Sequence, residues 1–340
     1  MLEKIVYGAI RHRWIVLLAS LLLGAIGAWN LARLPIDAVP DITNVQVQIN
    51  TEAAGYSPLE AEQRITFPIE TALAGLPRLS YTRSLSRYGL SQVTVVFGDG
   101  TDIYFARQLV NERLQGAKNQ LPDGLEPELG PIATGLGEIY MYTVEPEPGA
   151  RKPDGSEWTP TDLRTIQDWI VRPQLRNVPG ITEVNTIGGY ARQIQIAPDP
   201  VKMIAFGVDL HDLMLAVASN NGNRGAGYIE RSGEQYLVRV PGQVATPDDV
   251  RRIVVATRES VPIRIGDLAE VLEGEELRTG AATENGREVV LGTVFMLMGE
   301  NSRVVSRASA ARLAEIQKSL PRGIVVTTVY DRTNLVDRTI

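Results

Sequence analysis

An uncharged apolar segment near the N-terminus restricts the structure of this chain more than any other feature. Residues 14–32 read WIVLLASLLLGAIGAWNLA, with no charge and with only Ser20 and Asn30 polar. At about 1.5 Å per residue, a helix of this length nearly crosses a hydrocarbon layer of about 30 Å. The sequence therefore predicts one N-terminal membrane helix that stays in the mature protein.

The residues before this segment predict its orientation. Lys4, Arg11 and Arg13 precede the apolar stretch, so the positive-inside rule leaves the N-terminus in the cytoplasm and sends the following chain outward. The alternative is a cleaved signal peptide, with residues 25–27 (AIG) as a small-residue cleavage site. Because signal peptides usually carry a shorter apolar region of about 7–15 residues, a retained helix is favoured. In either case residues 35 onward are exported.

Composition excludes several classes of protein. The chain has 340 residues, a net charge of −6 with interspersed acids and bases, and no cysteine. Its length suits two or three domains, and its charge does not indicate a nucleic-acid surface. His12 and His211 are too far apart for an HExxH motif, and no Walker A, GxGxxG or GxSxG motif occurs. We therefore expect no enzyme activity and no permanently bound cofactor.

Two spacings that each occur twice indicate an internal duplication. Residues 57–60 (SPLE) and 159–162 (TPTD) each carry a helix-capping pattern, and each is followed by a proline twenty residues after its first residue, Pro77 or Pro179. The pattern RL-x6-LPxG likewise occurs twice, beginning at Arg113 and at Arg312. Each copy of that pattern closes an amphipathic helix before an extended stretch. A repeat of this kind predicts two related folding units.

Each predicted unit has the element order β-α-β-β-α-β, which is the ferredoxin-like arrangement. The second unit is interrupted by an insertion of about ninety residues, 188–276, with strands and short helices of its own. The fold class is therefore α+β. The expected elements are strand 43–50, helix 57–74, strands 79–86 and 90–97, helix 102–119 and strand 126–133, then strand 136–145, helix 160–177, strand 181–187, strand 287–298, helix 302–319 and strand 323–330.

The last residues begin an element that belongs to neither unit. Strand 323–330 completes the second copy, Asp331 is a natural N-cap, and Leu335, Val336 and Ile340 have helical spacing. An exported duplicated domain followed by a new helix suggests a polytopic protein that continues beyond this chain.

Long motifs in a fixed order carry a family resemblance. They include LPIDAVPDITNVQVQINT (34–51), YSPLEAEQRITFPIE (56–70), IQDWIVRPQLRNVPGITEVNTIGG (166–189) and GAGYIERSGEQYLVRVPGQV (225–244). The chain resembles, over all its residues, the N-terminal third of the heavy-metal efflux branch of the resistance-nodulation-division superfamily. Within that branch, it is most similar to the inner-membrane pump subunit of cobalt–zinc–cadmium efflux systems.

The resemblance implies a division of the chain. Residues 1–34 would form the first transmembrane helix, with 35–134 as porter subdomain 1 and 135–187 together with 277–330 as porter subdomain 2. Residues 188–276 would be a docking insertion, and 331–340 the start of the second transmembrane helix. Residues 35–330 would then lie in the periplasm of a bacterium.

The resemblance also implies a function and partners. The chain would be the N-terminal portion of a proton-driven efflux transporter for divalent Zn, Co or Cd in the inner membrane. Its partners would be these metal ions, membrane lipid, two further copies in a homotrimer, a periplasmic adaptor (membrane fusion) protein and an outer-membrane channel. Because the family's proton-relay carboxylates and the other half of its porter domain lie later, the portion would not transport alone. The alternative is a complete membrane-anchored periplasmic binding or adaptor protein.

Two acids are the candidate metal ligands. Divalent borderline cations favour carboxylate and imidazole ligands, and this chain offers mainly Asp and Glu. Glu138 lies in GLGEIY, early in the first strand of the second copy, and Asp168 lies in IQDW on the following helix. In the resembled family, acids of this subdomain help to line the substrate cavity. The alternatives are a solvated helix face for Asp168 and an edge-strand charge for Glu138.

Two further patterns have competing interpretations. Met296 and Met298 alternate on an apolar strand, which favours core packing over a thioether site for Cu(I). Residues 219–232 (SNNGNRGAGYIERS) are glycine-rich, which suits a protruding hairpin or a mobile loop. The resemblance favours an arm that reaches a neighbouring subunit, with Arg224, Tyr228 and Ile229 at the contact.

Overall fold

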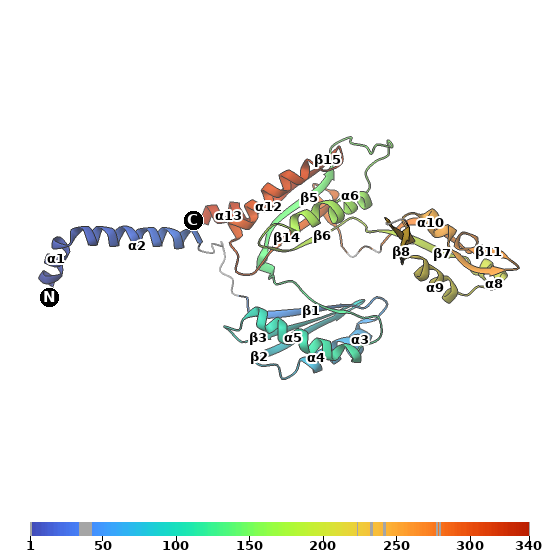
Figure 1. Ribbon diagram of the computed structural model, residues 1–340, viewed down its shortest axis with the longest axis horizontal. Coiled ribbons are helices and arrows are strands. Elements are labelled where there is room, and N and C mark those ends of the chain that lie inside the picture. The colour runs from blue at the N-terminus through green and yellow to red at the C-terminus, as the bar shows by residue number, and fades with distance from the viewer. Residues whose placement is uncertain are drawn as a thin grey trace. The chain divides into compact units, whose positions relative to one another are not determined.

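The computed structural model describes residues 2–33, 43–222, 224–231, 234–240, 243–276, 278 and 280–339 (Figure 1). The chain forms two compact units. Unit 1 contains Met1–Ala150, Gln167–Ile187 and Leu291–Ile340, and unit 2 contains Arg151–Ile166 and Gly188–Val290.

The N-terminal residues form two consecutive helices, α1 (Leu2–Arg11) and α2 (Arg13–Arg33). Within α2, the window Arg13–Asn30 is long and apolar enough to cross a membrane, with a mean hydropathy of 1.5. None of this window is buried against the rest of the protein. The position and length of the helix are those that the sequence predicts.

The first sheet is antiparallel and has the strand order β2-β3-β1-β4. Its strands are β1 (Gln46–Glu52), β2 (Leu79–Arg87), β3 (Leu90–Phe97) and β4 (Pro127–Leu129). Val47, Ile49 and Thr51 alternate into the core, as the pattern of TNVQVQIN predicts. The predicted strand 126–133 shortens to three residues, and Pro131, which has no N–H to donate to a ladder, follows soon after its end.

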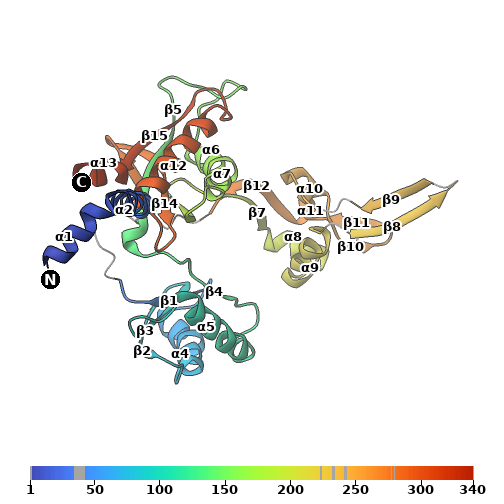
Figure 2. The same cartoon turned by 60° about the vertical axis from the view of Figure 1, so that its left-hand side comes forward.

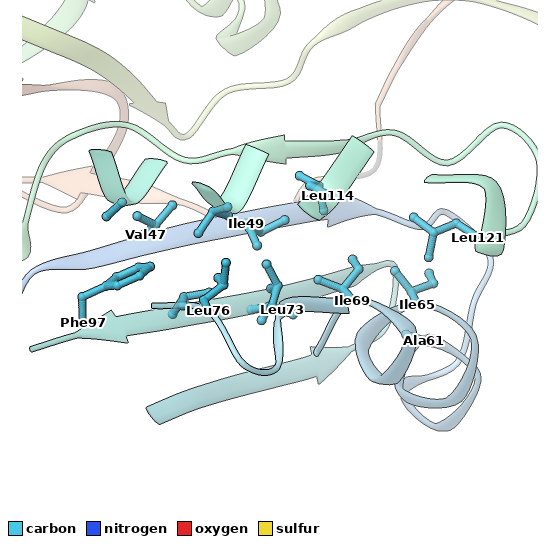
Figure 3. Packing of buried hydrophobic residues seen from close by; sticks show 14 of the residues in the cluster. Val47, Ile49, Ala61, Ile65, Ile69, Leu73, Leu76, Phe97, Leu114 and Leu121 are labelled. Carbon is cyan, nitrogen blue, oxygen red and sulfur yellow. The ribbon is translucent and has the colours of Figure 1, made fainter. Parts of the chain in front are cut away.

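Helices pack on this sheet and close a hydrophobic core (Figure 3). They are α3 (Pro58–Ala61), α4 (Phe67–Leu73) and α5 (Ile103–Ala117). Figure 3 shows Val47 and Ile49 of β1 beside side chains of the helices and of β3. The predicted capping box is present, since Ser57 Oγ accepts from the N–H of Glu60 while the Glu60 carboxylate accepts from the N–H of Ser57.

The second sheet has five strands, β5 (Glu138–Pro146), β6 (Ile181–Ile187), β13 (Ala282–Glu284), β14 (Arg287–Met296) and β15 (Ile324–Asp331). The order is β13-β14-β5-β15, and β6 also pairs with β14. The predicted second copy contributes β5, β6, β14 and β15 to this sheet. These strands lie in the order β6-β14-β5-β15, which corresponds to the order β2-β3-β1-β4 of the first sheet. The helices of this copy are α6 (Pro160–Ile166), α7 (Arg172–Arg176) and α12 (Ser302–Gln317).

A π-helical turn interrupts the first helix of each copy, where the sequence predicts continuous helices over 57–74 and 160–177. These turns are η1 (Glu62–Thr66) and η4 (Gln167–Val171). Each ends two residues before a proline, Pro68 or Pro173. A proline cannot donate to the carbonyl four residues earlier, and its ring clashes with that carbonyl in a regular α-helix. A wider π turn gives the ring room, so the proline is the physical reason for the interruption.

The end of the second copy differs slightly from the prediction. β15 includes Asp331, so the final helix α13 runs over Arg332–Thr339. The side chain of Asp331 still caps this helix, since its Oδ1 accepts from the backbone N–H of Thr333 at 2.8 Å.

Unit 2 has its own hydrophobic clusters and elements. Its main pair is β7 (Arg192–Pro198) with β12 (Ala269–Glu275). The other elements are α8 (Pro200–Phe206), α9 (Leu210–Asn220), α10 (Pro247–Arg252), β10 (Val254–Arg258), β11 (Val261–Arg264) and α11 (Ile265–Leu268).

Unit 2 also contains a hairpin of two antiparallel strands, β8 (Arg224–Arg231) and β9 (Glu234–Val240), visible in Figure 2. The glycine-rich stretch therefore supplies one strand of a hairpin, as one of its two interpretations predicts. The side chains of Arg224, Tyr228 and Ile229 lie outside the described part of the structure.

Candidate metal site

Asp168 is the second residue of the π turn η4, and its carboxylate is tied to the sheet. Thr186 of β6 donates its hydroxyl hydrogen to Asp168 Oδ1 over 2.7 Å. Arg172, four residues later, places Nη1 at 4.0 Å from the same oxygen. The Asp168 side chain is 22% exposed, so the carboxylate is partly buried.

A buried hydrogen-bond chain fixes the turn on which Asp168 lies. Tyr142 of β5 donates its hydroxyl hydrogen to Gln167 Oε1 over 3.0 Å, and Gln167 Nε2 lies 3.4 Å from Thr186 Oγ1. Tyr142 and Gln167 are both fully buried. Burial raises the pKa of Tyr142 far above its ordinary value, so the phenol stays a neutral donor. The network holds the Asp168 segment at a defined place on the sheet.

Glu138 is the first residue of β5 and follows a short 3₁₀ turn, η3 (Gly135–Gly137). Because β5 is bonded to β14 on one side and to β15 on the other, it is a central strand. The edge-strand interpretation of Glu138 is therefore wrong. Its backbone is held by Arg332, which is only 5% exposed and whose Nη1 lies 2.7 Å from the carbonyl oxygen of Leu136 and 3.5 Å from that of Glu138.

The two candidate carboxylates are on separate parts of the same fold. Along a strand, Glu138 shares a face with Tyr142 but precedes it by four residues, which is about 13 Å. Tyr142, and not Glu138, is hydrogen-bonded to Gln167, the residue before Asp168. Within the described ranges, no three His, Cys, Asp or Glu side chains are grouped so that they can hold a metal ion. Since a zinc shell needs about four ligands, neither acid can complete one by itself.

Only part of the surroundings of Asp168 and Glu138 could be predicted from the sequence. Pro173 inside a predicted helix marks the place where the helix departs from α geometry. Gln167, Thr186 and Arg332 were missed, because a buried glutamine or arginine looks like any polar surface residue until its partner is known.

The remaining candidates have ordinary structural roles. Met296 is buried at the end of β14, which supports core packing, and the strand ends there rather than at Met298. His211 is exposed on the first turn of α9, which Asp209 caps. Among the described residues, His211 is not part of a group of three or more His, Cys, Asp or Glu side chains that could hold a metal ion.

The chain is similar to known metal-resistance proteins. The cobalt-zinc-cadmium resistance protein CzcA of Cupriavidus metallidurans is 64% identical over 340 residues, which are 100% of this chain and 32% of that protein. The nickel-cobalt-cadmium resistance protein NccA of Alcaligenes xylosoxydans xylosoxydans is 46% identical over 100% of this chain and 34% of its own length. The chain thus spans about a third of the length of these relatives.

A solved structure and a family model agree with these relatives. A crystal structure of a heavy metal efflux pump superposes with a TM-score of 0.85 at 32% identity, over 98% of this chain and 32% of that one. The family model described as the AcrB/AcrD/AcrF family matches residues 5–340. This match covers nearly every residue, and the chain belongs to the AcrB/AcrD/AcrF family.

Proposed function

We propose that this chain handles metal ions in a proton-driven pump that exports divalent cobalt, zinc or cadmium. The observation that carries the proposal is the 64% identity, over all 340 residues, to a protein named for cobalt, zinc and cadmium resistance. The metal ion is cargo, so the proposed activity is transport rather than catalysis, and no resident cofactor is part of it. Transport would require the functions of the two thirds of the relatives that this chain does not match.

The proposal includes a location for each part. Helix α2 would cross the bacterial inner membrane with its basic N-terminal flank in the cytoplasm, and residues 35–330 would lie in the periplasm. The segments 35–134 and 135–187 with 277–330 would be two ferredoxin-like porter subdomains, 188–276 a docking insertion, and 331–340 the start of a second membrane helix. The equal strand order of the two sheets supports the duplication.

Within the second porter subdomain, Asp168 and Glu138 would contribute carboxylate oxygens to the transported ion. Carboxylates suit divalent cations of this class, and the chain has no cysteine to offer a softer ligand. The buried network behind Asp168 and the arginine behind Glu138 support the proposal, because a binding group works best when its neighbours fix it.

A chimeric pump tests the function. Residues 1–340 would replace the aligned third of Cupriavidus metallidurans CzcA, in a strain that lacks its own exporters. We expect resistance to zinc, cobalt and cadmium from the chimera, and loss of resistance at equal expression in Asp168→Asn and Glu138→Gln. Each amide keeps the size of the side chain and removes the charge that a cation requires.

The control is Glu157→Gln, which makes the same change at a side chain that is 80% exposed. It should leave resistance unchanged. A well-expressed chimera that gives no resistance would contradict the proposed function. Full resistance to all three metals in both amide variants would contradict the site while leaving the function in place.

The proposed partners are two further copies of the subunit, a periplasmic adaptor and an outer-membrane channel. The hairpin β8–β9 would tie neighbouring subunits together through Arg224, Tyr228 and Ile229. Cysteine pairs between the hairpin and its receptor in the chimera should form crosslinks between subunits. Crosslinks found only within one subunit would rule out the arm.

A complete periplasmic binding or adaptor protein is the other candidate. CzcA and NccA are both named as resistance proteins, and neither name refers to an adaptor. The pump is therefore the better-supported proposal.

A further inference from the structure

A positive charge lies beside the candidate metal ligand itself. Arg172 Nη1 is 4.0 Å from Asp168 Oδ1, and the two side chains are 34% and 22% exposed. The same oxygen already accepts a hydrogen bond of 2.7 Å from Thr186. Asp168 is thus an anchored carboxylate that meets a protein cation before any metal ion arrives.

The first copy of the duplication shows that this cation is not needed to build the turn. Glu62 begins the π turn η1, and its Oε2 accepts a hydrogen bond of 2.6 Å from Ser86 of β2. The position that corresponds to Arg172, directly after the turn, is Phe67, which carries no charge. The same kind of turn therefore holds an acid against a strand hydroxyl without an arginine.

An ion that binds to Asp168 would meet the charge of Arg172 at a separation of a few ångströms.

We propose that Arg172 is an internal counter-ion of Asp168 that competes with the transported divalent cation and keeps its binding weak enough for release. This inference rests on the proposed role of Asp168 in metal transport. Binding and release would exchange one cation for another: the guanidinium group moves toward solvent when the metal ion enters and returns when it leaves. Thr186 would keep the carboxylate in place in both states.

The physical reason is electrostatic. Two positive groups repel each other over a few ångströms, and the partly exposed position screens this repulsion without removing it. A transporter gains from moderate affinity, because a cargo that binds too tightly leaves slowly. Removing the charge of Arg172 should therefore tighten metal binding and slow its release by the same factor.

Titration of the purified chimeric pump in detergent with cobalt(II) chloride tests the inference. Trp169 adjoins Asp168 and is 79% exposed, so quenching of its fluorescence by the paramagnetic ion reports on this place. The Trp169→Phe variant identifies the part of the signal that comes from this side chain. We expect Arg172→Gln to bind cobalt about three- to tenfold more tightly than the unchanged chain, and to lose it to added EDTA more slowly by the same factor.

Two variants control for structure and for overall charge. Arg172→Lys keeps the charge and should bind within about twofold of the unchanged chain. Arg176→Gln removes an equal charge from the exposed last turn of α7 and should leave the affinity unaltered. Unfolding midpoints of all variants would be measured to identify any that fold poorly.

Asp168→Asn separates this inference from the proposed function. If Asp168→Asn binds cobalt more weakly but Arg172→Gln binds no more tightly than the unchanged chain, the counter-ion role is wrong and the metal ligand stands. Equal tightening by Arg172→Gln and Arg176→Gln would also overturn it, because overall charge would then explain the effect. If Asp168→Asn binds as well as the unchanged chain, both the ligand and its counter-ion are wrong.

Discussion

At the scale of single residues, buried polar groups near Asp168 are matched in pairs. Tyr142 and Gln167 satisfy each other inside the core of the second copy. A buried hydrogen bond adds about 1 kcal/mol net, but a buried group left without its partner costs about 1–3 kcal/mol. The hydrogen bond between Tyr142 and Gln167 therefore contributes more to fixing the position of the π turn η4 than to the free energy of unfolding.

This asymmetry predicts the result of a double-mutant cycle. Gln167→Leu should lower the free energy of unfolding by about 1–3 kcal/mol, because the Tyr142 hydroxyl is left unpaired. Adding Tyr142→Phe should restore part of that loss. Urea unfolding of the chain in detergent measures both, and Gln63→Leu, an exposed residue of the first π turn, is the control. Strictly additive losses would show that the pair does not interact.

At the scale of elements, the junction between β15 and α13 is fastened to the start of β5. Arg332 donates to the carbonyl group of Leu136, and Ser306 of α12 donates to Asp331 Oδ1 over 2.6 Å. Asp337 of α13 pairs with Arg303 and Arg307 of α12. The start of β5, the start of α12, and α13 are therefore held together by direct side-chain contacts.

The Asp331 contact predicts a pH dependence. Burial alone would raise the pKa of Asp331, but hydrogen bonds from Ser306 and Thr333 outweigh burial and lower the pKa below its ordinary value. The folded chain therefore binds this proton less readily than the unfolded chain. The contact stabilises the fold above about pH 4 and is lost as the pH falls through the folded-state pKa.

Urea midpoints measured between about pH 5 and pH 2 test this dependence. Asp331→Asn should flatten the acid-side fall in stability, because the titrating group is gone. Ser306→Ala, which removes one donor and keeps the carboxylate, should flatten it partly. An unchanged slope in Asp331→Asn would mean that Asp331 does not titrate in this window.

Close packing between strands predicts opposite effects for two glycines. An ideal Cβ on Gly292 of β14 would overlap Cζ of Tyr142, whose ring is fully buried, while a Cβ on Gly116 of α5 would meet nothing within 4 Å. Gly292→Ala should cost about 1–3 kcal/mol through overpacking. Gly116→Ala should stabilise α5 by about 0.5–1 kcal/mol, because alanine is the better helix former. Unfolding free energies measure both, and destabilisation by Gly116→Ala would contradict the packing argument.

Helix starts and strand faces were predictable from local chemistry, whereas the anchors of the site were not. The capping box at Ser57 and the alternation of Val47 and Ile49 depend on neighbours within a few positions. Arg332 instead bonds to a carbonyl 196 positions earlier, and Gln167 depends on Tyr142 25 positions earlier. Residues so far apart in the sequence become neighbours only because of the order of the strands. Their contacts therefore cannot be predicted from a spacing in the sequence.

At the scale of the whole molecule, the N-terminal helix decides which compartment each part occupies. The window Arg13–Asn30 has no charge after Arg13, and basic residues lie before it. If α2 stays in the membrane, α1 lies on the cytoplasmic side, and the residues after α2 lie on the other side. A cleaved leader would export the same residues without an anchor.

Single cysteines distinguish these outcomes, because the chain has none of its own. We expect Gln63→Cys, at an exposed position of η1, to react with a membrane-impermeant maleimide in intact cells. Glu3→Cys, in α1, should react only after the inner membrane is opened, because the basic flank holds it in the cytoplasm. N-terminal sequencing of the membrane fraction should begin at Met1 or Leu2. Equal labelling of both cysteines in intact cells, or a sequence that begins near Ala28, would mean that α2 does not anchor the chain.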